Sequence, residues 1–164
     1  MIRAASIQAG MSGSIPADAV VADTVTLEYD SRYRRRIALS GDAGLAFLLD
    51  LPEATELREG DRLKLDDGRV VLVRAADEPV ADLLCRDPRH LVRVAWHLGN
   101  RHLPTQIFAD KLRIRQDHVI ETMAEGLGAR VERRLAPFDP EGGAYGRGRT
   151  QGHNHGHAHG HAHD

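Results

Sequence analysis

Short runs of apolar and alternating residues fill the first half of the chain. Residues 20–27 are largely apolar and β-branched, residues 63–65 alternate between apolar and polar, and residues 70–73 are continuously apolar. Asp66-Asp67-Gly68, between the last two runs, is typical of a tight hairpin turn. With another run at residues 34–39, six or so short strands fit into this part of the chain. The pattern predicts a small β-sandwich or a barrel-like domain.

In the second half the apolar positions recur with a helical period instead. Asp87-Pro88 offers an N-cap residue followed by a proline at the first helical position. Leu91, Val94 and Leu98 then follow at spacings of three and four residues. This spacing predicts an amphipathic helix that ends near Gly99-Asn100.

A second helix has start and stop signals of its own. Asp117 is placed to cap it, and Gly128 stands where a left-handed C-terminal cap is needed. Candidate strands precede, separate and follow the two helices, which gives the order βαββαβ of a ferredoxin-like split βαβ domain. The predicted fold class is therefore α+β. The strands are expected at residues 80–85, 105–109, 112–115 and 130–135.

The end of the chain has a composition of its own. From Pro137 onward glycine and proline dominate, and the final twelve residues contain no apolar residue larger than alanine. Such a segment cannot bury a core, so a flexible linker and a disordered tail are expected. The pattern thus divides the chain into a β-rich part at residues 1–76, a ferredoxin-like part at 77–138, and the linker and tail at 139–164.

Histidine alternates with small residues throughout the tail. Imidazole is mostly neutral near pH 7, because its ordinary pKa is about 6.5, and its nitrogens then bind Ni²⁺, Cu²⁺, Zn²⁺ or Co²⁺. A purification tag is the alternative, but tags are usually uninterrupted histidine runs. We expect the tail to capture metal, although it does not identify which metal. Its ligands would be His153, His155, His157, His159, His161 and His163.

The bulk composition narrows the class of protein. The 164 residues suffice for one domain or two small ones, and 22 basic against 24 acidic residues give a net charge of −2. That balance makes no electrostatic case for nucleic acid or an anionic membrane. Cys85 is the only cysteine, which excludes an internal disulfide and a cysteine-built zinc site. With no signal-peptide pattern and no apolar run of membrane-spanning length, a soluble cytoplasmic protein is expected.

His97 is the candidate ligand that we single out in the folded part. On a helical wheel it lies at the flank of the apolar stripe, where residues are half-exposed and suited to a partner surface. One imidazole cannot hold a divalent ion, but in a two-fold dimer the same residue of both subunits supplies two ligands. A purely structural histidine is the alternative. A structural or solvated role is also the better interpretation of His102, His118 and Cys85, and a contribution from His90 stays open.

The densest basic run is Arg32-Tyr33-Arg34-Arg35-Arg36. Its ordinary interpretation is a solvated strand face, and its functional interpretation is a docking surface for an acidic partner or a nucleic acid. The chain has no aromatic-rich RNA-binding sequence, GXXG loop, P-loop, H-E-x-x-H or G-x-S-x-G motif. Metal ligands without a catalytic base or nucleophile indicate a protein that carries a metal rather than an enzyme that uses one.

Several motifs resemble the UreE family of urease accessory nickel chaperones. The most specific is Trp96-His97-Leu98-Gly99-Asn100-Arg101-His102, together with the trailing histidines. The resemblance covers about residues 15–164. The other matching motifs are Asp30-Ser31-Arg32, Arg34-Arg35-Arg36, Asp66-Asp67-Gly68, Leu112-Arg113-Ile114, Asp117-His118-Val119, Gly126-Leu127-Gly128-Ala129, and the segments 57–61 and 136–145.

This resemblance implies a homodimer in which His97 binds nickel at the subunit interface and the tail histidines add capacity. It further implies that Ni²⁺ is cargo, passed to a GTPase partner and then to apo-urease by a protein that is not itself an enzyme. Zn²⁺ or Cu²⁺ would also bind, since nitrogen sites hold Cu²⁺ more tightly than Ni²⁺. Neither a nucleic acid nor a membrane is an expected partner. Two other functions stay open: metal storage or buffering, and a ferredoxin-like nucleic-acid-binding module.

Overall fold

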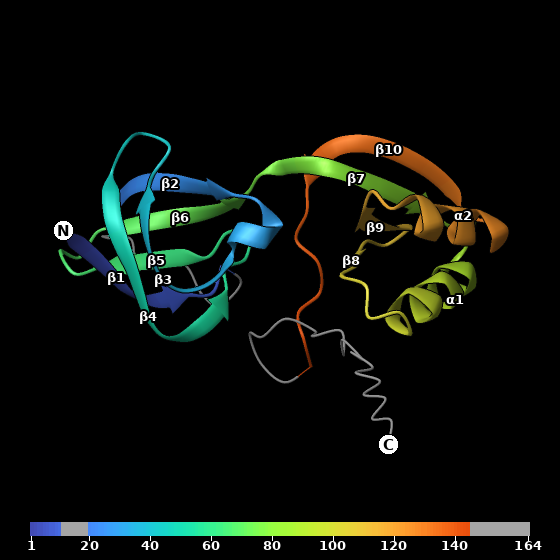
Figure 1. Cartoon of the computed structure of the whole chain (residues 1–164), viewed down its shortest axis with the longest axis horizontal. Helices are drawn as coiled ribbons and strands as arrows, with labels where there is room; N and C mark the ends of the chain where they lie inside the picture. The colour runs from blue at the N-terminus through green and yellow to red at the C-terminus, as the bar shows by residue number, and fades with distance from the viewer. Residues whose placement is uncertain (11–19, 145–164) are drawn as a thin grey trace, which may run out of the picture.

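The computed structural model describes residues 1–10 and 20–144, and in it two β-sheets lie side by side along the long axis (Figure 1). The first sheet has six strands in the order β2-β6-β5-β1-β4-β3 and curls on itself, which confirms the barrel-like part of the predicted fold class. Its strands are β1 (Ile2–Gln8), β2 (Val21–Leu27), β3 (Tyr33–Ser40), β4 (Ala46–Glu56), β5 (Arg62–Leu65) and β6 (Val70–Ala75), and a short 3-10 helix, η1 (Tyr29–Ser31), precedes β3.

The core of this sheet comes from alternating inward positions on its strands. Phe47, Leu49 and Leu51 alternate along β4, and together with Leu63 of β5 they belong to one buried apolar cluster. Strands β5 and β6 pair as the antiparallel hairpin that the sequence predicts. The turn between them needs glycine, because Gly68 has a φ of +86°, a left-handed value that glycine adopts without strain.

The second sheet has the strand order β10-β7-β9-β8, and each neighbouring pair is antiparallel. Combined with the chain order βαββαβ, this is the ferredoxin-like arrangement, so the second part of the predicted fold class is confirmed. The elements are β7 (Asp77–Leu84), α1 (Pro88–Gly99), β8 (Gln106–Ile107), β9 (Lys111–Arg115), α2 (His118–Gly126) and β10 (Arg130–Pro137).

Both helices begin and end at the predicted signals. The Asp87 carboxylate accepts a hydrogen bond from the backbone N–H of His90 at 2.7 Å, and Asp117 accepts one from Ile120 at 3.1 Å. The chain leaves α2 through Gly128, whose φ is +93°. None of the helices in the described residues is long and apolar enough to span a membrane. The apolar stripes of α1 and α2 pack on one face of the sheet, in a buried cluster of Ala81, Leu83, Val94, Leu98, Leu112, Ile114, Ile120, Ala124 and Ala129.

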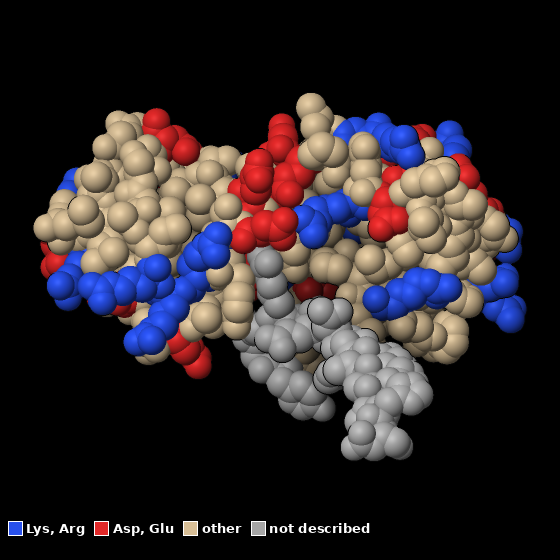
Figure 2. Space-filling view, viewed as in Figure 1, with Lys and Arg blue, Asp and Glu red and all other residues tan. Residues whose placement is uncertain are grey.

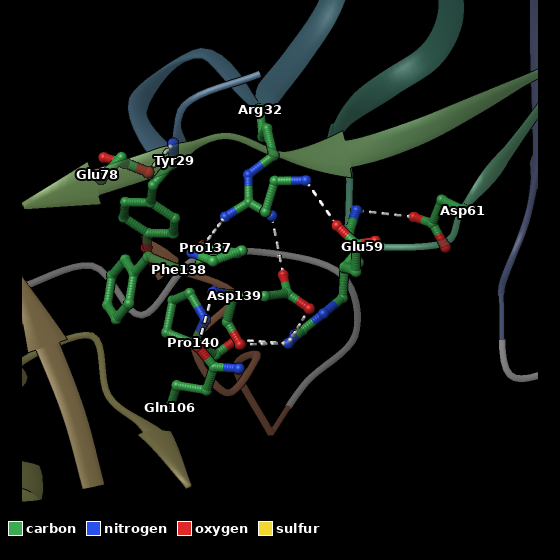
Figure 3. Close-up of polar contacts among 12 residues, drawn as sticks. Tyr29, Arg32, Glu59, Asp61, Glu78, Gln106, Pro137, Phe138, Asp139 and Pro140 are labelled. Carbon is green, nitrogen blue, oxygen red and sulfur yellow. Dashed lines mark hydrogen bonds and ion pairs between the residues drawn. The ribbon is translucent and has the colours of Figure 1, made fainter. Parts of the chain in front are cut away.

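Along the chain only Ala76 separates β6 of the first sheet from β7 of the second. A buried junction of side chains also joins the two sheets (Figure 3). The Arg32 side chain is fully buried there. Its guanidinium donates hydrogen bonds to the Phe138 carbonyl and, at 2.9 Å, to the Asp139 carboxylate. The Tyr29 ring packs edge-to-face on Phe138, with the ring centroids 5.4 Å apart. The segment that follows β10 is therefore tied to the first sheet.

Candidate metal site on helix α1

Helix α1 presents His97 in its last turn, at the edge between its buried and exposed sides, and the side chain is half-buried. In the described part of the chain neither ring nitrogen of His97 has a hydrogen-bond partner, and its backbone carbonyl accepts a hydrogen bond from the Arg101 guanidinium at 3.1 Å. The His97 imidazole packs edge-to-face against the Trp96 indole, with the ring centroids 5.0 Å apart and an angle of 88° between the ring planes. The fold therefore uses neither ring nitrogen of His97 within the described residues.

His90, two turns earlier on the same helix, is used quite differently. Its side chain is buried, with an exposed fraction of 2%. Nδ1 accepts a hydrogen bond from the backbone N–H of Arg86 at 3.2 Å, and Nε2 lies 2.9 Å from the Leu127 carbonyl oxygen. The neutral tautomer with its proton on Nε2 satisfies both contacts. His90 therefore has a structural role, joining the start of α1 to the end of α2.

In the described residues the other candidate ligands do not join His97 in a group of three that could hold a metal ion. His102 is exposed in a left-handed turn, with a φ of +54°, and His118 is exposed at the first position of α2. The Cys85 thiol is half-buried; burial and the negative charge of Asp87 raise its pKa, so the thiolate that a metal needs is disfavoured. Within residues 1–10 and 20–144 no three His, Cys, Asp or Glu side chains are grouped closely enough to hold a metal ion.

The six tail histidines that the sequence predicts as ligands, His153 to His163, lie outside the described residues. The segment that leads toward them runs past α1. The backbone N–H of Glu141 donates to the Thr105 carbonyl at 2.9 Å. Glu141 and Gly142 also line a cleft of about 200 Å³ together with Ala95 and Gly99 of α1. Residues 141 and 142, which precede the tail in the chain, therefore lie beside the helix that carries His97.

Three large apolar side chains are exposed around this cleft, and we call them the α1 patch. Val92 and Trp96 lie one turn apart on α1 with exposed fractions of 66% and 63%, and Ile107 of β8 is 49% exposed. Ile107 lines the cleft with Ala95 and Gly99, which are the helix neighbours of Val92 and Trp96. Neighbouring exposed apolar side chains of this size are typical of a surface that another protein covers.

The structure does not place the basic run at residues 32–36 on one surface. Arg32 is fully buried in the junction, and Arg34 is half-buried. Arg36 lies 3.7 Å from the Asp50 carboxylate, while Arg35 is exposed and has no recorded partner among the described residues. Sequence reasoning missed the burial of Arg32, because its partner Asp139 is 107 residues away in the chain.

Comparison with known proteins covers both sheets and the tail. The family model for the N-terminal domain of the UreE urease accessory protein matches residues 5–76, and the model for its C-terminal domain matches residues 78–164. Two proteins named urease accessory protein UreE are 65% identical over 124 residues, from Bradyrhizobium sp., and 59% identical over 145 residues, from Rhodopseudomonas palustris. These alignments cover 76% and 88% of this chain.

They cover only 60% and 66% of the relatives themselves, so the chain spans less than two thirds of the length of these proteins. A third relative of the same name, from Chelativorans sp., is 52% identical over 145 residues, which are 88% of this chain and 87% of that protein. Both family models and all three relatives agree, and together they show that the chain belongs to the UreE family of urease accessory proteins.

Proposed function

We propose that this protein is a nickel metallochaperone for urease maturation: a cytoplasmic homodimer, not an enzyme, that hands Ni²⁺ to a urease accessory GTPase, which passes it to apo-urease. Membership of the UreE family supports the role in urease maturation. The observation that carries the metal site is His97, an imidazole whose ring nitrogens the described part of the fold does not use, beside the exposed α1 patch. The single Cys85, without a disulfide partner, suits a reducing compartment.

The metal site and the homodimer depend on each other. One imidazole provides too few ligands for a divalent ion, whereas a two-fold axis beside α1 brings His97 of both subunits together. Such an interface also covers Trp96, whose indole packs against the His97 ring, and removing its apolar surface from water favours association. Zn²⁺ and Cu²⁺ would compete for the same nitrogens, so the choice of nickel rests on the family and on cellular supply.

Delivery requires a site that releases its ion. Two neutral imidazoles leave coordination positions open, which lets the ligands of an acceptor enter before those of the donor leave. The tail histidines would collect and buffer further ions. The composition of the last 20 or so residues predicts a flexible segment, and a segment of that length has a root-mean-square reach of roughly 25 Å. Glu141 and Gly142, which precede it, lie beside α1, so we expect the tail histidines to reach His97.

Metal storage or buffering is the second candidate, favoured by the number of tail histidines. A storage protein needs many ions but no acceptor and no tight site between subunits. Storage and delivery therefore differ in what they require of His97. The nucleic-acid-binding alternative is weakened, because the basic run on which it rested is divided between the junction and the surface.

Equilibrium dialysis against Ni²⁺ at pH 7.5 tests the proposal on wild type, a truncation after Gly152, and His97→Ala. We expect the truncation to lose most bound nickel yet keep about one tight ion per dimer, and His97→Ala to lose that ion. His118→Ala is the matched control, because it removes an exposed imidazole from α2, and it should keep the tight ion. Unchanged stoichiometry after truncation would place the main sites in the two sheets.

The same measurement across pH tests the nature of the ligands. Protons compete with metal for imidazole nitrogens, so nickel capacity should fall steeply between about pH 7 and 5.5. A capacity that stays constant over this range would identify carboxylates as the ligands and refute the histidine sites.

A further inference from the structure

A cleft of about 440 Å³ lies where the two sheets meet, and carboxylates dominate its polar lining. Glu28, Asp30, Glu78 and Asp117 line it, and Arg115 is the one basic residue among the described residues around it. Figure 2 shows acidic side chains gathered between the two sheets. Four carboxylates against one guanidinium leave a surplus of three negative charges, so the cleft attracts a cationic group.

The described residues only partly compensate these carboxylates. Arg115 lies 2.7 Å from the Asp30 carboxylate. Glu78 is only 7% exposed, and Oε2 of its side chain accepts a hydrogen bond from the backbone N–H of Tyr29 at 2.7 Å. Oε1 of Glu78 has no partner in the described part of the chain. Because a carboxylate removed from water is costly without a cation or several donors, Glu78 favours an occupant that carries a guanidinium or ammonium group.

The chain itself supplies guanidinium groups beyond the described residues. Residues 143–163 contain no aspartate or glutamate, and their basic residues other than histidine are Arg147 and Arg149. Residues that are two apart in an extended segment face the same side. An extended Arg147-Gly148-Arg149 would therefore present both guanidinium groups to one surface.

The last described residues lie close enough to bring this segment to the cleft. Leu103 and Pro104 line the acidic cleft and also the smaller cleft beside α1, which Glu141 and Gly142 line. The two clefts therefore share a wall. Arg147 follows Gly142 by five residues, and a stretch of five residues spans up to about 17 Å when extended. Arg147 is thus within reach of the acidic cleft.

We propose that Arg147 and Arg149 dock in the acidic cleft of their own chain and attach the segment before the histidines to the two sheets. The inference goes beyond nickel delivery and does not depend on it, because no metal ligand takes part. Charge-assisted hydrogen bonds between guanidinium and carboxylate groups are the expected contacts. Only three residues separate Arg149 from His153, so the histidine tail would start from the cleft.

NMR relaxation of the full-length protein, without added metal, tests this attachment. In 50 mM NaCl we expect backbone order parameters above about 0.6 at residues 147 and 149, since lower values mark a flexible backbone. They should fall in 500 mM NaCl, because salt screens the contact. Arg147→Gln/Arg149→Gln should bring both below about 0.6 and shift the amide signals of Tyr29 and Gln116. Gln116 lines the cleft, and the Tyr29 N–H donates to Glu78.

Glu28→Gln/Glu78→Gln tests the other side of the contact. Glutamine keeps the side-chain shape and an acceptor for the Tyr29 N–H but removes two negative charges, so it should release the segment as the arginine variant does. Glu53→Gln/Glu125→Gln is the matched control, because it removes two exposed carboxylates from β4 and α2, outside the cleft. The control should leave the order parameters unchanged.

Three results would overturn the proposal. The first is an order parameter below about 0.6 at both arginines in wild type at low salt. The second is an equal loss of order in the control, and the third is an arginine variant that leaves the Tyr29 and Gln116 signals unshifted. If residues 147 and 149 are flexible in wild type and an added hexa-arginine peptide shifts those two signals, the cleft serves a basic segment of another molecule instead.

Discussion

At the junction between the sheets, the Arg32 guanidinium is fully buried and donates to Phe138 and Asp139, whereas Arg93 on the outer side of α1 is exposed without a recorded carboxylate partner in the described residues. The histidines of α1 differ in the same way. Both ring nitrogens of His90 are engaged inside the fold, while those of His97 are not. The junction engages both terminal nitrogens of Arg32 within the fold, although its buried Nε has no partner among the described residues, whereas the fold does not use the ring nitrogens of His97.

We expect this difference to separate residues that stabilise the fold from residues that bind metal or a partner. A polar group satisfied inside the protein should affect stability when it is replaced, because its removal leaves buried partners unpaired. A polar group on the α1 surface should affect binding and leave stability nearly unchanged. Each of the following measurements tests that separation.

Replacing Arg32 should have the largest effect on stability. Arg32→Met keeps much of the side-chain volume but leaves the Phe138 carbonyl unpaired and weakens the hold on Asp139. We expect the free energy of unfolding to fall by about 3 kcal/mol, as for other buried ion pairs that lose one partner. Urea unfolding measures this, with Arg35→Met as the control, expected within about 0.5 kcal/mol of wild type. Equal losses in both variants would remove the distinction between junction and surface.

Asp82 allows a pH test of whether a buried carboxylate that is hydrogen-bonded within the protein stabilises the fold. Burial alone would raise the pKa of this carboxyl, but hydrogen bonds and charges from Arg113 and Lys111 outweigh burial and lower it. Because the folded-state pKa is lowered, the ionised group stabilises the fold above the ordinary carboxyl range, near pH 4, and this stabilisation is lost as the pH falls through the lowered value.

Asp82→Asn should therefore cost about 2 kcal/mol at pH 7 and show a flatter loss of stability on acidification than wild type. Urea midpoints measured from pH 7 down to pH 3 give both quantities. Parallel curves for the two proteins would mean that Asp82 contributes no pH-dependent stability.

Replacing either histidine of α1 should have the smallest effect on the free energy of unfolding. The two variants can be compared directly, because both remove an imidazole from the same helix. His90→Ala leaves the Leu127 carbonyl and the Arg86 N–H without their partner, so we expect a loss of about 1.5 kcal/mol. His97→Ala should change stability by less than about 0.5 kcal/mol, since the ring is half-buried without a recorded hydrogen bond and alanine favours helix. A larger loss for His97 than for His90 would reverse their assigned roles.

Local signals made most of the second sheet predictable from the sequence. Asp87 and Asp117 cap their helices, and Gly128 ends α2, because capping and left-handed turns depend on residues near in the chain. Strand β1 could not be predicted this way, since only Ala4 of its seven residues is buried and its partners β4 and β5 are distant. Strand β4 does not show a clear alternation of apolar and polar residues in the sequence, because Leu48, between the buried Phe47 and Leu49, is apolar but only half-buried.

The candidate site was predictable only in part. A helical wheel places His97 at the flank of the apolar stripe of α1, and in the structure the residue is half-buried. The wheel alone does not distinguish His97 from His90, which is buried. That distinction depends on the Leu127 carbonyl, which α2 delivers 37 residues later. The exposure of Trp96 and the missing partners of Arg93 likewise depend on how the elements pack.

Activation of apo-urease at limiting nickel tests the central claim most directly, with wild type, His97→Ala and the truncation after Gly152 side by side in a reconstituted system. If a site shared by His97 of two subunits presents the metal, His97→Ala should sharply reduce activation although it removes only a small fraction of the nickel capacity. The truncation should lose most of that capacity and still activate more urease than His97→Ala. If His97→Ala activates as well as wild type while the truncation fails, the tail alone delivers the metal and His97 is structural.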